Sequence, residues 1–106
     1  MENNIGIAIH GGAGTILKSE MTDELEKNYL TGLKEAINKG YEILKTGGSA
    51  VDAVEKSVVV LENNPLFNAG KGSVFNHKGH HEMDASIMDG LSLNAGSVCC
   101  VQKFKN

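Results

Sequence analysis

Tryptophan and arginine are both absent from the 106-residue chain, and aromatic residues make up only 5% of it. Without arginine, the chain has no guanidinium group to hold a substrate carboxylate through two parallel hydrogen bonds. The net charge of −3 leaves no basic excess for nucleic-acid binding. No apolar run is long enough to cross a bilayer, and the first residues lack the basic and apolar regions of a signal peptide. We therefore expect neither nucleic acid nor a membrane among its partners.

Cysteine is scarce as well, with Cys99 and Cys100 as the two in the chain. Neighbours in sequence cannot easily form a disulfide with each other, and in a regular strand their side chains point to opposite faces. Two thiols without a disulfide framework are typical of a reducing compartment, so we expect a cytoplasmic protein.

Two helices are predicted. The first begins after Thr22, a suitable N-cap, and ends at Gly47–Gly48. The second begins at Ser49, which forms a capping box with Asp52, and ends before Pro65. The predicted apolar faces have three- and four-residue spacing: Leu25, Tyr29, Leu33, Ile37, Tyr41 and Leu44 in the first helix, and Val51, Val54, Val58 and Leu61 in the second.

Strand patterns lie before and after these helices. Ile5–Ile9 alternates isoleucine with small residues, which predicts a strand. Residues 65–90 indicate a glycine-rich loop and an antiparallel meander, with turns at Asn76–Gly79 and at Asp89-Gly90. Residues 91–102 form a further strand with Gly96 as a possible bulge. The expected fold class is α+β, with two helices and about four strands in one domain at most.

The sequence HGGAG at His10–Gly14 has several interpretations. Its glycines suit a tight turn after a buried strand. A phosphate-binding loop is weakly supported, because neither G-K-S/T nor G-x-G-x-x-G occurs. An esterase-type oxyanion hole would need a G-x-S-x-G elbow, and none of Ser49, Ser73 and Ser97 stands in one. We interpret HGGAG as a segment that shapes the backbone.

Possible metal ligands and acid–base groups gather in one region. His77, His80, His81, Glu82 and Asp84 form a dense cluster, and His77-x-x-His80 has a spacing that zinc sites use. An exposed turn explains the histidines better. Asp84 and Asp89 could be paired carboxylates, but Asp89 is explained by its turn. A structural role for Asp84, in which a partner compensates its charge within the strand, is favoured over a catalytic one.

The loop at Leu61–Gly72 is a candidate cation site. A helix end that runs into LFNAGKG leaves several carbonyl oxygens without partners inside the helix. Such oxygens can converge on a hard cation.

Three blocks in this order, namely HGGAG, FNAGKGSVF and EMDASIMDG, resemble the plant-type asparaginases, also called isoaspartyl peptidases. These enzymes are N-terminal-nucleophile hydrolases. The resemblance implies a four-layer αββα sandwich and the hydrolysis of L-asparagine or β-aspartyl dipeptides. It also implies that residues 1–106 are a partial domain, the N-terminal part of the α-subunit of a self-cleaving precursor.

The resemblance implies a threonine nucleophile that lies beyond residue 106. None of Thr15, Thr22, Thr31 and Thr46 stands in the G-T-V-G-like setting that the family uses, so we expect the isolated chain to be inactive. Carried over by position, His10, Gly11, Gly12 and Asn68 would support the active site. Main-chain oxygens would hold a structural sodium ion at Leu61, Glu62, Asn64, Phe67, Ala69 and Lys71. No organic cofactor is implied.

The implied partners are the rest of the precursor and a second αβ unit in a dimer. Two alternatives stay open: a relative that acts on glycosylated asparagine, and a stand-alone, non-catalytic binding domain.

Overall fold

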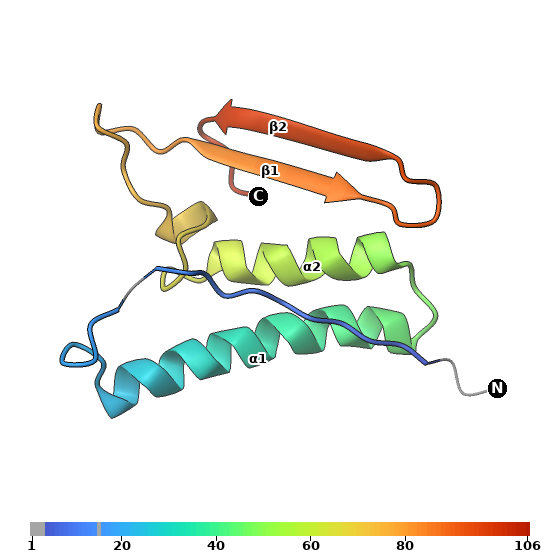
Figure 1. Cartoon of the computed structure of the whole chain (residues 1–106), viewed down its shortest axis with the longest axis horizontal. Coiled ribbons are helices and arrows are strands. Elements are labelled where there is room, and N and C mark those ends of the chain that lie inside the picture. Colours follow the sequence, from blue (N-terminus) through green and yellow to red (C-terminus); the bar gives the residue numbers. More distant parts are fainter. Residues whose placement is uncertain (1–3, 15) are drawn as a thin grey trace.

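The computed structural model describes residues 4–14 and 16–106. Its elements are α1 (Asp23–Lys45), α2 (Ala50–Asn63), the 3₁₀ turn η1 (Gly70–Gly72), β1 (Met83–Met88) and β2 (Ala95–Val101). Figure 1 shows the two helices side by side, with the β1–β2 hairpin on the side of α2 away from α1. The two predicted helices are confirmed. The expected count of about four strands is wrong for the described residues, in which two strands form one antiparallel sheet.

The helix ends follow the predicted capping residues. Thr22 Oγ1 accepts a hydrogen bond of 3.1 Å from the Leu25 N–H at the start of α1. At its end, Gly47 has a φ of 84°, and the Gly48 N–H donates to the Ile43 carbonyl. In α2, Ser49 Oγ accepts from the Asp52 N–H at 3.0 Å and donates to the Asp52 carboxylate at 2.7 Å. These local contacts satisfy backbone groups that the helix ends would otherwise leave free.

Small residues form the contact between α1 and α2. Gly32, Ala36 and Gly40 are buried on α1, and Ala53 and Ser57 are buried on α2. A methyl group placed on Gly40 would collide with the Ser57 and Ile7 side chains and lie 2.9 Å from the Ala53 carbonyl oxygen. Close approach of the helices therefore depends on residues without bulky side chains.

The predicted apolar faces were partly wrong for this reason. Tyr41 is 44% exposed, and Val54 and Val58 are 41% and 48% exposed. Leu25, Leu33 and Ile37 are half-buried beside the contact. The large side chains flank the line of closest approach, and the small residues between them occupy it.

Ile5–Ile9 is extended but is not part of a sheet. Its isoleucines are half-buried and alternate with exposed Gly6, Ala8 and His10. The strand prediction is wrong for the described residues, because no strand hydrogen-bonds to this segment there. It runs instead along the helix pair (Figure 1), where Ile7 lies next to Gly40.

The meander prediction was correct for one turn and wrong for the other. The Asn76 N–H donates to the His80 carbonyl and the Gly79 N–H to the Asn76 carbonyl, which confirms the first turn. Val74 and Phe75 before it form no strand. Instead of a two-residue turn at Asp89-Gly90, a longer loop runs to Asn94, whose carbonyl accepts from the Asp89 N–H.

A bulge interrupts β2 at a different residue from the predicted one. Gly96 pairs regularly with Ile87. The register changes between Met83↔Val101 and Ala85↔Val98, so Asp84 lies opposite both Cys99 and Cys100. Cys100 has a φ of 53°.

Little of the described chain is enclosed. Its radius of gyration is 15.6 Å, against roughly 13 Å for a compact domain of about 100 residues. The buried hydrophobic residues are Ala36, Ala53 and Phe67, and the Ser57 hydroxyl is buried without a hydrogen-bond partner. Neither helix combines the length and the apolar character needed to cross a membrane.

Candidate functional site

The two glycine-rich loops pack against consecutive residues of α1. Gly11 lies against Leu33, where an added methyl group would be 2.7 Å from Leu33 Cδ2. Gly32 lies against Phe67, where the corresponding distance to Phe67 Cε2 is 2.9 Å. Because Gly32 and Leu33 are consecutive, the structure brings the segment His10–Gly12 near the loop after α2. His10, Gly11 and Gly12 are themselves exposed.

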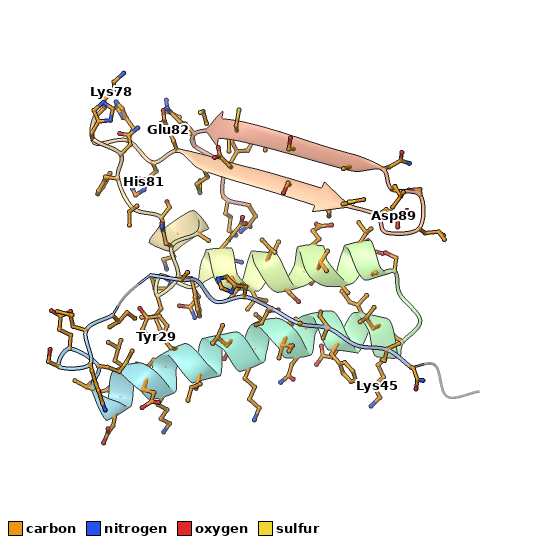
Figure 2. The ribbon with its side chains drawn as sticks, in the orientation of Figure 1. Tyr29, Lys45, Lys78, His81, Glu82 and Asp89 are labelled. Carbon is orange, nitrogen blue, oxygen red and sulfur yellow. The ribbon has the colours of Figure 1, made fainter. Side chains whose placement is uncertain are left out.

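Phe67 anchors the loop that follows α2. Its side chain is 5% exposed, and its ring meets the Tyr29 ring edge to face, with centroids 5.7 Å apart. Figure 2 shows Tyr29 pointing from α1 toward this loop. Asn64 Oδ1 accepts from the Leu66 N–H at 3.0 Å and fixes the turn at Pro65. The loop is therefore held in place by an aromatic contact and a side-chain cap.

Two glycines of this loop lie very close to main-chain carbonyl groups. Gly70, with a φ of 52°, approaches the Glu62 carbonyl so closely that a methyl group there would lie 2.6 Å from its oxygen. A methyl group on Gly72 would collide with the Phe67 carbonyl and lie 2.6 Å from the Pro65 oxygen. The six residues predicted as sodium ligands all fall in the segment that folds around these glycines. Carbonyl oxygens are ligands for hard cations, so the donor set fits one.

Some of these carbonyl oxygens already accept one backbone hydrogen bond. The carbonyls of Leu61, Phe67 and Ala69 accept from the N–H groups of Asn64, Ala69 and Gly72, respectively. Each carbonyl oxygen has a second lone pair that remains available to a ligand.

Asn68 holds the exit of the loop. Its Oδ1 accepts from the Val74 N–H at 3.0 Å, and the residue is exposed. The predicted support residue therefore lies on the surface of the loop, with its amide oxygen bonded to the backbone six residues later.

The predicted cluster of metal ligands does not converge. Among the described residues, no three His, Cys, Asp or Glu side chains come together around one point. Glu82 accepts from Asn76 Nδ2 at 2.9 Å and from Gln102 Nε2 at 3.0 Å. Asp84 Oδ1 accepts from the Cys100 N–H at 2.8 Å. These contacts give both carboxylates a structural role.

Asp84 and Asp89 do not form a catalytic pair. They are five positions apart along the chain, which corresponds to roughly 16 Å of extended strand. Asp89 accepts from the hydroxyl and N–H of Ser92 and from the Leu91 N–H. These bonds, with the Ser92 hydroxyl first, lower the pKa of Asp89. Figure 2 shows Asp89 at the opposite end of the hairpin from Glu82.

Comparison with known families assigns the chain. A family model described as Asparaginase matches residues 3–106. The chain belongs to the asparaginase family.

Curated relatives agree with this assignment. An isoaspartyl peptidase/L-asparaginase of Danio rerio is 52% identical over 100 residues, which are 94% of this chain and 31% of the relative. One of Xenopus laevis is 50% identical over 100 residues, with the same coverage of both chains. A plant-type L-asparaginase of Pyrococcus furiosus is 50% identical over 102 residues, 96% of this chain and 32% of the relative. The chain thus spans about a third of the length of these relatives.

The three threonines that the structure describes lie within α1 or at its ends. Thr22 caps α1, and the Thr46 hydroxyl donates to the Glu42 and Ile43 carbonyls. Thr31 is exposed within α1. Thr15 lies outside the described residues.

One contact beside the loop after α2 was not predicted from the sequence. Ser73 Oγ and His81 Nδ1 are 3.0 Å apart, and the His81 ring lies over Phe75 with centroids 4.2 Å apart. The signal was the predicted turn at Asn76–Gly79, since Ser73 and His81 lie at equal distances on either side of His77. The pair fastens the two arms of this exposed turn at the edge of the loop.

Proposed function

We propose that this chain is the N-terminal part of the α-subunit of an enzyme that hydrolyses L-asparagine or β-aspartyl dipeptides. One observation carries the proposal: 94–96% of the chain aligns at 50–52% identity with relatives named isoaspartyl peptidase/L-asparaginase or plant-type L-asparaginase. The two glycine-rich loops that carry the family resemblance both pack against α1, at Leu33 and Gly32.

The proposed nucleophile is a threonine outside these 106 residues, exposed as a new N-terminus when the precursor cleaves itself. Its hydroxyl attacks the side-chain amide or β-peptide carbonyl, and its own α-amino group, with a pKa of about 7.7–8.0 in unperturbed form, accepts the proton. Hydrolysis of the acyl-enzyme by water releases aspartate.

This chain supplies the support for that nucleophile. His10, Gly11 and Gly12 present exposed backbone close to α1. Asn68 lies at the exit of the neighbouring loop, fixed by its bond to Val74. We assign these residues to positioning the threonine, because Gly11 packs against Leu33 and Asn68 is bonded to the backbone of its own loop.

A chimera tests this function. Residues 1–106 replace the aligned segment of the Danio rerio relative, and hydrolysis of a β-aspartyl dipeptide, asparagine and glycosylated asparagine is measured. We expect self-cleavage and β-aspartyl hydrolysis by the chimera and none by the 106-residue chain alone. Asn68→Ala should lower kcat, whereas Lys78→Ala at the exposed turn is the matched control. A cleaved but inactive chimera, or turnover by the isolated chain, would contradict the proposal.

We also propose that the loop after α2 binds sodium through the main-chain oxygens of Leu61, Glu62, Asn64, Phe67, Ala69 and Lys71. The close approach of Gly70 to the Glu62 carbonyl and of Gly72 to the Phe67 carbonyl supports it. The ion would neutralise these carbonyl dipoles and stiffen the loop that carries Asn68.

Thermal unfolding in sodium chloride and in choline chloride at equal ionic strength tests the ion. Sodium at a hundred times its Kd should stabilise the chain by about 2.7 kcal/mol. Lys71→Ala should keep this effect, because only the main chain of residue 71 is a ligand. Equal unfolding temperatures in the two salts would exclude the site.

We further propose a cytoplasmic dimer of αβ units. The exposed β1–β2 sheet provides surface for the rest of the enzyme, and the two free, exposed cysteines suit a reducing compartment. Light scattering of the processed chimera should give the mass of two αβ units, and a mass of one unit would refute the dimer.

A further inference from the structure

The bulge in β2 creates a pair of neighbouring thiols that the proposed function does not use. Cys99 and Cys100 occupy two positions opposite the single residue Asp84. Both cysteines are free and exposed. The site lies on the hairpin, away from the loops around Gly32 and Leu33.

The bulge changes the direction of the side chains. In a regular strand, consecutive side chains point to opposite faces. Here Cys100 has a left-handed φ of 53°, and a bulge redirects side chains in this way. A hydrogen bond with the Cys99 side chain is among the causes that raise the pKa of Cys100, which agrees with the bulge that places Cys99 and Cys100 together opposite Asp84. The expectation of opposite directions assumed a regular strand, and the bulge removes that premise for this pair.

Asp84 holds the bulge in this form. Its Oδ1 accepts the Cys100 N–H at 2.8 Å, a donor that the ladder leaves free because the register has shifted. Asp84 is thus a positioning residue for the thiol pair, acting through the backbone of Cys100.

The local charge affects the reactivity of the pair. Cys99 most strongly raises the pKa of Cys100, and the carboxylates of Asp84 and Glu82 raise it further. Cys100 therefore stays protonated at neutral pH, which slows reagents that attack a thiolate. A ligand that condenses with neutral thiols avoids this penalty.

We propose that Cys99 and Cys100 form a dithiol site for trivalent organoarsenic compounds. Such an acceptor is thiophilic and needs only two sulfur ligands from the protein. A divalent cation that requires three or four ligands is less well matched, because no third His, Cys, Asp or Glu side chain joins the pair among the described residues.

The binding step balances without oxidation or reduction. A dihydroxyarsine loses both As–O bonds and gains two As–S bonds, one to each cysteine. The two thiol protons leave with the two hydroxyl groups as two molecules of water. Arsenic remains trivalent.

Phenylarsine oxide is the probe, titrated into the reduced 106-residue chain and followed by intact mass spectrometry with glutathione as a competing monothiol. We expect one adduct per chain that survives glutathione and is released by 1,2-ethanedithiol. Cys99→Ser and Cys100→Ser should each weaken retention about a hundredfold, since the second As–S bond forms intramolecularly. An adduct that survives glutathione in either single variant would overturn the proposal.

Separate controls measure how much the folded bulge adds to the affinity for the arsenical. Because the cysteines are neighbours in sequence, a peptide of residues 97–102 serves as the reference, and the folded chain should bind roughly tenfold tighter through preorganisation. Asp84→Ala should lose most of this advantage, and Asp84→Asn, which keeps an acceptor oxygen, should retain it. Circular dichroism checks that the variants stay folded. Equal affinity of chain and peptide would overturn the structural site.

Discussion

The helix pair and the β1–β2 hairpin differ in how their side chains are packed. Ala36 and Ala53 in the helix contact are 0% and 1% exposed. In the hairpin, Met83 and Val101 are half-buried and every other strand residue is exposed. The helices are therefore stabilised by contacts between distant residues. The hairpin depends mainly on its ladder and on local side-chain bonds.

The helix pair and the hairpin are also loosely packed against each other. An open groove of about 720 Å³ separates α2 from the sheet, and Val54, Val58, Ile87 and Val98 are among the residues that line it. These apolar side chains face one another without close packing. A change in the helix contact should therefore unfold the chain, whereas a similar change in the hairpin should remain local.

Truncation of phenylalanine should give the largest contrast. Phe67→Ala removes a side chain that is 5% exposed and contacts Tyr29, and we expect a loss of roughly 3–5 kcal/mol in unfolding free energy. Phe104→Ala removes one that is 66% exposed and should change stability by less than about 0.5 kcal/mol. Urea denaturation followed by circular dichroism measures both.

Phe67→Leu keeps the experiment informative if the alanine variant does not fold. Its loss should lie between the other two values. Equal losses at positions 67 and 104 would show that the buried contact of Phe67 with Tyr29 adds no stability.

A smaller contrast is expected from glycine. Gly40→Ala places a methyl group against Ser57, Ile7 and the Ala53 carbonyl, and overpacking of this kind costs about 1–3 kcal/mol. Alanine's better helix propensity returns up to about 1 kcal/mol. Gly96→Ala in β2 meets no atom within 4 Å and should be neutral, or stabilising by up to about 0.5 kcal/mol. A Gly40→Ala variant more stable than the parent would show that the helices can move apart.

The same contrast explains which parts of the fold could be predicted from the sequence. Helix ends were predictable because Thr22, Ser49, Asp52 and Gly47 act on backbone groups within a few residues. The buried helix faces were not predictable. A search for apolar periodicity selects large hydrophobic residues, whereas the contact is built from Gly40 and its small neighbours. The pairing of Ile5–Ile9 could not be judged, since a strand needs a partner that no local pattern supplies.

Some features of the candidate site could likewise be predicted from the sequence, and others could not. The family and its loops were recognisable because three motifs kept their residues and order. The contact between Ser73 and His81 and the bulge at Cys99–Cys100 depend on register, and a one-residue change in register redirects side chains. Gly96 was the expected bulge because of its residue type. The observed bulge is instead fixed by the Asp84 side chain, which bonds across the ladder.

The smallest expected effect is a local one, at Asp89 in the hairpin loop. Its folded pKa is lowered below 3.8, so its hydrogen bonds stabilise the loop above that value and are lost as pH falls through the folded pKa. Carboxyl NMR titration should find this low pKa, and Ser92→Ala, which removes the largest cause, should raise it toward 3.8. Protection of the Leu91 and Ser92 amides should fall over the same acidic range, while amides around Ala36 and Ala53 keep theirs. Loss of protection in both regions together would mean that hairpin and helices unfold as one unit, which their different packing argues against.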